Sequence, residues 1–195
     1  MQAATEENTI VIDGVSWDAY LQMDELLGDA PVRMKWCDEC LEIISPISRH
    51  HELIKSNIAR MIELFCRRKG IFFQITGSAT LRKERQRGGE PDDSYIFTRG
   101  QETTDLVVEA ALSSGGIDKL EFYLPLEIPE VWVWQRGALR VHSYRAGKYV
   151  QVESSQFLPG LALSLVERLA EHPYTSDALN EFETELDKCS GTAGG

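Results

Sequence analysis

The chain has 195 residues, 43% of them hydrophobic and 26% charged, which is the size and composition of a single globular domain over residues 1–195. Its net charge of −11 argues against a broad DNA-coating surface, because sequence-independent binding relies on Lys and Arg contacts to phosphate, but DNA in a local basic groove stays possible. We see no apolar run of the ~18 residues that span a bilayer and no secretion signal, so we expect a cytoplasmic protein without a membrane partner.

The first half of the chain predicts two helices and a hairpin between frayed ends, which we expect at residues 1–8 and 188–195. A short strand is expected at TIVIDG (9–14). A helix follows from the N-cap Ser16 to Gly28. VRMKW (32–36) and CLEII (40–44) read as a hairpin with its turn near Asp38. The longest helical pattern runs over residues 45–70, with apolar residues at helical spacing, a basic end and a terminal glycine.

The second half alternates strands with helices. Strands are predicted at FFQIT (72–76), ATLRK (79–83), PDDSYIF (91–97) and TDLVVEAAL (104–112), the last with the apolar pattern of a strand buried on both faces. A helix is predicted within residues 114–126. A meander follows at EVWVW (130–134), LRVHSY (139–144) and KYVQV (148–152), and two helices end the chain at 157–172 and 176–188. This order predicts an α/β or α+β fold: a curved mixed sheet flanked by helices.

Acidic residues stand where the pattern predicts buried strands. Asp92 begins one strand, and Glu109 lies inside the next, between LVV and AAL. If these strands pair, both carboxylates face one pocket and need a cation, and their hard oxygens suit Mg²⁺ or Mn²⁺. Lys119 could then orient a water or a phosphate. The alternative is a strand-entry turn at Asp92 and Asp93, with Lys119 exposed and paired to neighbouring acids of its own helix, Asp118 or Glu121.

Two further motifs have open interpretations. The basic run LRKERQRGGE (81–90) predicts either a solvated hairpin turn or a local DNA-binding groove. Cys37 and Cys40 have C-x-x-C spacing, but no second pair follows at the distance found in zinc fingers, so free thiols are favoured over a zinc or redox site.

Several motifs follow one another in the chain: LEIISP and then HHELI, GEPDDSYI, TDLVVEAALSSGGIDKLEFY, and IPEVWVWQRGALRVHSY ending in LPGLAL. Taken together in this order, they resemble the Uma-two restriction endonuclease family, a branch of the PD-(D/E)xK nuclease superfamily. The resemblance covers about residues 12–169. It implies a restriction-endonuclease-like core and a metal-dependent nuclease that acts on DNA.

The resemblance also implies site residues. Pro91-Asp92 matches the family's proline–aspartate pair, and Glu109 matches the strand acid. The family's lysine usually stands two residues after that acid, here Ala111, and is matched instead by Lys119. Glu52 matches a helix glutamate that often helps to hold metal, although favourable charge at a helix start explains it too.

Four more features complete the comparison of motifs. His51 stands beside Glu52, either in the site or as a core residue at the helix start. Tyr123 and Trp132 resemble family positions that core packing explains adequately. The chain departs from the family around the strand acid, where it reads EAALSSGG rather than E-V-V-S or E-V-V-W.

Two classes of function follow. The first is a Mg²⁺- or Mn²⁺-dependent DNA endonuclease in which Asp92, Glu109 and Glu52 hold the ion and Lys119 acts on water and phosphate, without a small-molecule organic cofactor. The second is a catalytically silent homologue that keeps the fold as a protein-interaction or dimerisation module. A homodimer is expected in either case, because two-fold pairs are common and would suit cutting both DNA strands.

Overall fold

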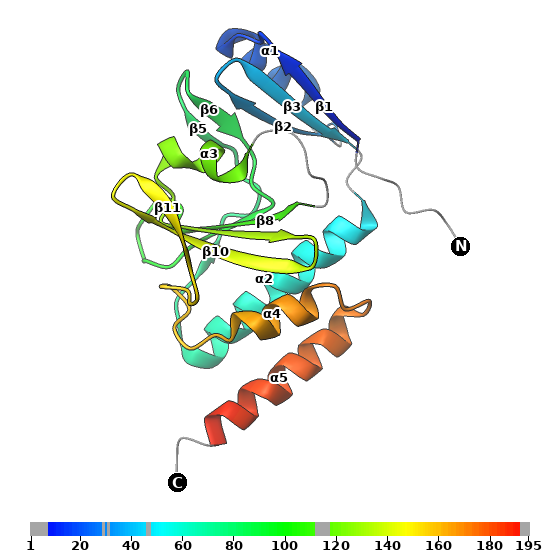
Figure 1. The fold of residues 1–195 in the computed structure, drawn as a ribbon, viewed down its shortest axis with the longest axis vertical. Helices are drawn as coiled ribbons and strands as arrows, with labels where there is room; N and C mark the ends of the chain where they lie inside the picture. Colours follow the sequence, from blue (N-terminus) through cyan, green and yellow to red (C-terminus); the bar gives the residue numbers. More distant parts are fainter. Residues whose placement is uncertain (1–7, 29, 31, 46–47, 112–117, 192–195) are drawn as a thin grey trace, which may run out of the picture.

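A computed structural model describes residues 8–28, 30, 32–45, 48–111 and 118–191 (Figure 1). The helices of this part are α1 (Trp17–Leu27), α2 (Arg49–Lys69), α3 (Lys119–Tyr123), α4 (Leu163–Ala170) and α5 (Thr175–Gly191), and a 3₁₀ turn η1 (Leu124–Leu126) follows α3. Asn8 belongs to the first strand and Lys188 to the last helix, so part of each end predicted as frayed is regular structure. The remainder of those ends, 1–7 and 192–195, lies outside the described residues.

The strands form two sheets. The first, here called the N-terminal sheet, has the order β1-β3-β2-β6-β5 and is antiparallel throughout. The second, here called the central sheet, has the order β11-β10-β9-β8-β7-β4. The bounds are β1 Asn8–Asp13, β2 Arg33–Cys37, β3 Cys40–Ser45, β4 Gln74–Ile75, β5 Leu81–Lys83, β6 Arg87–Gly89, β7 Asp93–Ile96, β8 Leu106–Ala111, β9 Glu130–Gln135, β10 Ala138–Arg145 and β11 Lys148–Val152.

The predicted fold class is confirmed, since the described residues form an α+β fold with an open mixed sheet. β8 pairs in parallel with β9 and antiparallel with β7, and the other pairs of the central sheet are antiparallel. Five of the six β8 residues are buried, as its apolar run predicted. The sequence pattern gave no sign that the strands would separate into two sheets.

Local signals place the first two helices as predicted. The Ser16 side chain accepts a hydrogen bond from the Ala19 backbone N–H at the start of α1, and Gly28 ends that helix. Ser48 caps α2 in the same way by accepting from the His51 N–H. Gly70 ends α2 in the left-handed conformation that favours glycine.

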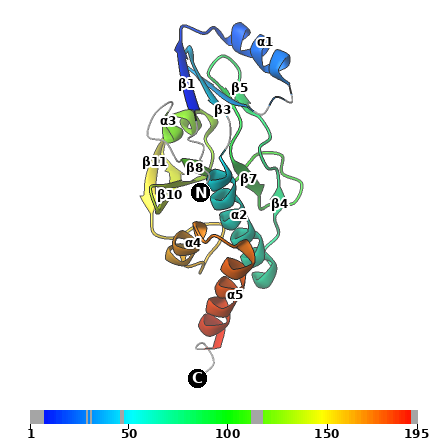
Figure 2. The same cartoon turned by 90° about the vertical axis from the view of Figure 1, so that its right-hand side faces the viewer.

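The main hydrophobic core lies between one face of the central sheet and the helices α2, α4 and α5. Figure 1 shows these helices below the sheet, with α2 running along it, and both views show α5 on the outside (Figure 2). The buried side of α2 contributes Ile54, Ile58, Met61, Ile62 and Phe65, all fully buried. This packing fixes the start of α2, and therefore His51 and Glu52, against the end of β8.

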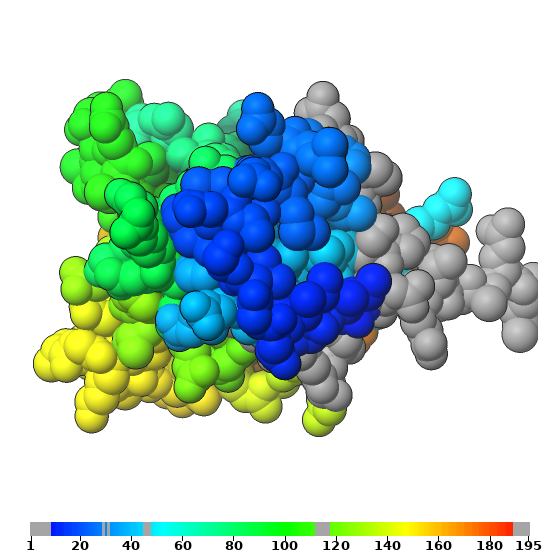
Figure 3. Space-filling view, turned by 90° about the horizontal axis from the view of Figure 1, so that it is seen from above, coloured from blue at the N-terminus to red at the C-terminus, as the bar shows by residue number. Residues whose placement is uncertain are grey.

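The N-terminal sheet lies at the opposite end of the molecule, with α1 on its outer face (Figure 1). Successive side chains of a strand point to opposite faces of the sheet. Met34 and Trp36 of β2 therefore face α1, while Arg33 and Lys35 face the other way. That inner face is turned toward α3 and β8. The space-filling view from above shows that the N-terminal elements, in blue, form this end of the surface (Figure 3).

Close packing inside the N-terminal sheet requires two glycines on β6. A Cβ at Gly88 would stand 2.5 Å from the ring of Tyr20, and a Cβ at Gly89 would stand 2.8 Å from Cγ of Lys35. Glycine therefore lets α1 close on one face of β6 and lets a lysine side chain cross the other face.

None of the helices in the described part of the chain combines the length and the apolar composition that crossing a membrane requires.

Asn57 of α2 ties the two last helices to the core. Its fully buried amide donates to the carbonyls of Ala170 and His172 at 3.0 Å each, and it accepts from the Thr175 hydroxyl at 2.7 Å. We expect Asn57→Ala to lower the free energy of unfolding by about 2–3 kcal/mol or more, because several buried groups lose their partners together. The exposed Asn180→Ala in α5 is the control and should change it by less than about 0.5 kcal/mol. Urea unfolding measures both, and equal small effects would contradict this role.

Candidate functional site

Of the two acids predicted from the sequence, Glu109 stands on β8 and Asp92 directly precedes the neighbouring strand β7. Asp93 of β7 is paired with Val108 of β8, so Asp92 lies one position further along, opposite Glu109. The Asp92 Oδ2 accepts a hydrogen bond of 2.7 Å from the Ala110 backbone N–H, which follows Glu109. Both acids are buried, with 6% and 2% of their surface exposed. Asp92 is a bend residue just before β7 and Asp93 begins that strand, so the two acids do stand at a strand entry, as the alternative expected, but both are buried.

Glu109 is surrounded by three donors. The Lys35 Nζ lies 2.5 Å from its Oε1, and the Tyr123 hydroxyl donates to the same oxygen. The Lys119 Nζ lies 3.7 Å from Oε2. Lys119 therefore reaches the strand acid from α3, as the resemblance implied.

The alternative pairing of Lys119 with an acid of its own helix is wrong. The Lys119 Nζ pairs with Glu109 and Glu42, whereas Asp118 caps the start of α3 by accepting from the Glu121 N–H. Tyr123 also does more than pack in the core, because its hydroxyl contacts the acid. Trp132 is fully buried and donates to Glu130, in agreement with core packing.

Asp92 is held by a second set of donors. The Arg33 guanidinium pairs with Oδ1, and His51 Nε2 lies 3.0 Å from Oδ2. Because an ionised carboxylate can only accept, His51 Nε2 is the donor. His51 is therefore a buried residue of the site, packed at the start of α2.

Glu52 lies at the edge of this cluster. Its side chain is 44% exposed, and its carboxylate lies 3.2 Å from Lys55, 3.8 Å from Arg33 and 3.6 Å from His51 Nδ1. It also stands in the first turn of α2, where negative charge stabilises a helix. Its assignment as a metal ligand stays a prediction.

Three charged residues of the cluster were missed by the sequence analysis: Arg33 and Lys35 on β2, and Glu42 on β3. Lys35 and Glu42 are opposed in the β2–β3 hairpin, and both are buried, with 3% and 1% exposed. The signal was present in the sequence, since each interrupts an apolar strand, which is the argument that identified Glu109.

Two aromatic rings and a glycine contact the side chain of Lys35. Its ammonium lies 5.6 Å from the ring centre of Phe122 and 5.7 Å from that of Tyr123, and Gly89 leaves space for its stem. A buried ammonium held by a carboxylate and two aromatic faces is a built feature of the fold.

The electrostatics follow from burial and these ion pairs. Burial alone would raise the pKa of Glu109, but the ammonium groups of Lys35 and Lys119 outweigh it and lower the pKa to about 2. Burial and the nearby Arg33 guanidinium lower the pKa of His51 to about 4, so its imidazole is neutral near pH 7. Burial raises the pKa of Asp93, which faces the other side of β7 and accepts from Tyr95.

The donor set decides whether a divalent ion fits here. Among the described residues, no three His, Cys, Asp or Glu side chains are grouped closely enough to hold one. Mg²⁺, however, is usually bound through one or two carboxylates and keeps several waters, so the Asp92 and Glu109 carboxylates are a chemically suitable pair. In this arrangement each of them is neutralised by protein cations instead.

The basic run 81–90 is a hairpin, as one of its two interpretations predicted. Lys83 pairs with Arg87 across β5 and β6. Arg82 forms an ion pair with Asp24, and the Arg87 guanidinium lies 2.8 Å from Asp38 Oδ1. These cations therefore stabilise the N-terminal sheet, which weakens the interpretation as a DNA groove.

Cys37 and Cys40 are free thiols facing each other across the β2–β3 turn. Burial raises the pKa of Cys37 to about 11, so its thiol is protonated near neutral pH.

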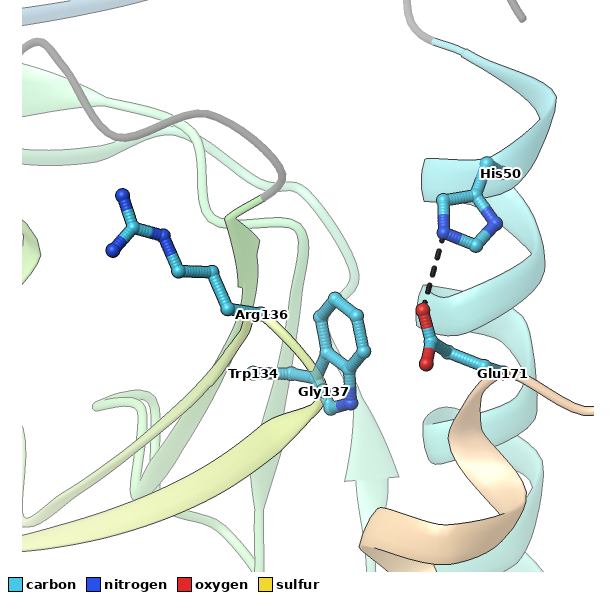
Figure 4. A pocket seen from close by; sticks show the side chains of 5 residues that line it. All are labelled: His50, Trp134, Arg136, Gly137 and Glu171. Atoms are coloured by element: carbon cyan, nitrogen blue, oxygen red, sulfur yellow. Dashed lines mark ion pairs between the residues drawn. The ribbon is translucent and has the colours of Figure 1, made fainter.

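A separate hollow of about 380 Å³ lies beside the start of α2. His50, Trp134, Arg136, Gly137 and Glu171 line it, and Figure 4 shows His50 and Glu171 facing each other, 3.3 Å apart, while Arg136 points away from them. None of the predicted acids or lysines lines this hollow.

Comparison with known proteins identifies one matching family. Residues 17–171, more than half of the chain, match the Uma2 family, whose description is "Putative restriction endonuclease". No curated protein matches the chain.

The charge balance around Glu109 predicts an acid limb of stability. Its folded pKa of about 2 lies below the ordinary value of 4.5, so its contribution is full above pH 4.5 and is lost as the pH falls toward 2, at about 1.4 kcal/mol per pKa unit. Urea unfolding across this range should show a shallower loss for Glu109→Gln than for the wild type. Lys35→Met should move the loss to higher pH. Equal slopes in the wild type and Glu109→Gln would contradict the pairing.

Proposed function

Because the chain belongs to the Uma2 family, we propose that it is a metal-dependent endonuclease that hydrolyses phosphodiester bonds of DNA. The observation that carries the proposal is the meeting of Glu109 with Lys119 in the cluster that also holds Asp92. Two carboxylates and an ammonium from three elements are the groups that phosphodiester hydrolysis with a bound ion requires.

Asp92 and Glu109 are the residues proposed to hold Mg²⁺ or Mn²⁺, with Glu52 at the rim. The ion would supply charge stabilisation for the phosphate and a bound water of lowered pKa. The two carboxylates give it a rigid support, because Glu109 is on the central strand β8 and Asp92 is hydrogen-bonded to the backbone of that strand.

The remaining side chains are proposed to position these groups. Lys119 is the more exposed of the two lysines, at 17% of its side-chain surface against 3% for Lys35, so it is the one that can meet a phosphate. Tyr123 orients Glu109 through its hydroxyl. Arg33 and His51 orient Asp92.

The alternative of a catalytically silent homologue has one observation in its favour. Arg33 and Lys35 already neutralise the two acids from within the protein, so the fold does not need an ion for its own stability. Under this alternative the same contacts serve only to join the N-terminal sheet to the central sheet.

A homodimer is part of the proposal, and β1 offers a surface for it. Within the described chain, β1 pairs with one strand, β3, and it exposes Ile10, Val11 and Ile12 at 57%, 47% and 39%. An antiparallel pair of two β1 strands centred on Val11 would place Ile10 opposite Ile12 of the second copy. Apolar residues would then meet across a two-fold axis, and an open strand edge would be covered.

The nuclease activity can be tested with supercoiled plasmid and Mg²⁺ or Mn²⁺. We expect nicking or linearisation that stops when the ion is chelated. Glu109→Ala and Lys119→Ala should each reduce the rate by about a hundredfold or more, because each removes a charged group at the reacting centre.

Two substitutions of the same type serve as controls for this assay: Glu84→Ala on the β5–β6 turn and Lys148→Ala on β11, both at exposed positions. They should cut at the wild-type rate. Cleavage that is equal in the wild type and the two site variants would assign it to a contaminant or to another site.

The dimer has its own test by sedimentation. The wild type should sediment as a dimer and Ile10→Lys as a monomer, because a charge at the paired edge opposes association. Ile75→Lys, at a 49% exposed position on the edge strand β4 of the other sheet, should remain dimeric. A wild type that is monomeric across the measured concentrations would remove this part of the proposal.

A further inference from the structure

One buried carboxylate of the cluster has no role in the function proposed above. Glu42 of β3 is 1% exposed, and its Oε2 has no hydrogen-bond partner among the described residues. A buried and unsatisfied carboxylate oxygen is costly, so its presence on an otherwise apolar strand calls for a partner.

The nearest cation is Lys119. Its Nζ lies 4.0 Å from Glu42 Oε2 and 3.7 Å from Glu109 Oε2. Both distances are longer than a charge-assisted hydrogen bond, so the ammonium stands between two carboxylate oxygens without bonding closely to either. This point between the two oxygens is a place for a positive charge.

In contrast to Glu42 Oε2, both carboxylate oxygens of Asp92 have close partners. Its Oδ1 is taken by Arg33, and its Oδ2 accepts from both His51 and the Ala110 N–H. An ion at Asp92 would have to displace donors that the fold fixes on three elements. An ion at the Oε2 atoms of Glu42 and Glu109 would have to displace only the ammonium of Lys119, whose side chain is 17% exposed.

We propose that Glu42 is a third carboxylate of the site and that the divalent ion binds between Glu42 and Glu109, at the position taken here by the ammonium of Lys119. This inference rests on the proposed metal dependence and changes its ligand set. Glu109 remains a ligand. Asp92 becomes a positioning residue, which holds Arg33, His51 and the backbone of β8 around the site.

The geometry of the hairpin supports this assignment. Glu42 is opposite Lys35, and both point from the inner face of the N-terminal sheet toward Glu109. The two carboxylates therefore reach the same point from different sheets. Two carboxylates beside the partly exposed Lys119 match the preference of Mg²⁺ and Mn²⁺ for hard oxygen ligands.

Binding of Mn²⁺ alone to the full chain tests the inference without reference to catalysis. Titration followed by electron paramagnetic resonance, which counts free Mn²⁺, should show one site in the wild type. Glu42→Gln and Glu109→Gln should each weaken binding by about tenfold or more, since even residues outside the ligand shell cost that much. Asp92→Asn should weaken it less than Glu42→Gln does.

Two further variants separate ligation from folding. Glu130→Gln removes an equally buried carboxylate, whose oxygens are satisfied by the Trp132 indole and the Gln156 N–H, and it should bind Mn²⁺ as the wild type does. Lys119→Met should bind at least as tightly as the wild type, because it vacates the site. The double variant Glu42→Gln/Lys119→Met should bind Mn²⁺ more weakly than Lys119→Met does. Thermal unfolding confirms that each variant is folded at the titration temperature.

The outcomes distinguish the inference from the proposed function. Wild-type affinity in Glu42→Gln together with a loss in Asp92→Asn would overturn the inference and keep the ion at Asp92 and Glu109. Loss in Glu42→Gln without cleavage of plasmid by the wild type would support the inference and refute the nuclease. A wild type that binds no Mn²⁺ would refute both the inference and the proposed metal dependence.

Discussion

The neutralisation of one buried carboxylate governs the arrangement of this protein. Glu109 stands on the central strand β8 with 2% of its surface exposed, and burial of an unpaired charge would cost several kcal/mol. Lys35 from β2 and Lys119 from α3 supply the compensating charge, and Tyr123 adds a hydrogen bond. The N-terminal sheet is therefore joined to the central sheet by an ion pair, in addition to its apolar contacts.

Much of the secondary structure was predictable, because its signals are local. The apolar run around Glu109, the cap at Ser16 and the glycine at position 70 each act within a few residues of the chain. Asp92 and Lys119 were proposed from their positions next to the predicted strands, the family resemblance supported both, and the structure brings their side chains into one cluster with Glu109. Lys119 lies ten residues from Glu109 in the sequence, and no local rule would have chosen it over another lysine.

The partners of these acids could not be predicted, because they come from the opposite sheet. Lys35 precedes Glu109 by 74 residues, and their contact depends on how the two sheets are placed. A charged residue in an apolar strand indicates that a partner exists but does not identify it. The partners of Glu42 and Arg33 could not be identified from the sequence for the same reason. Tyr123 was assigned to packing alone, since the sequence cannot show where a hydroxyl points.

The two sheets are also connected covalently next to the site. Gly89 ends β6 of the N-terminal sheet, and Asp93 begins β7 of the central sheet, so Asp92 belongs to a three-residue link between them. A folding intermediate with the central sheet complete and the N-terminal sheet absent would contain Glu109 without Lys35. Such an intermediate would keep Lys119 and Tyr123 near the acid at its centre but would lack its closest cation. The cooperativity of folding is thereby coupled to assembly of the polar cluster, and a partly folded chain that lacks the N-terminal sheet is disfavoured.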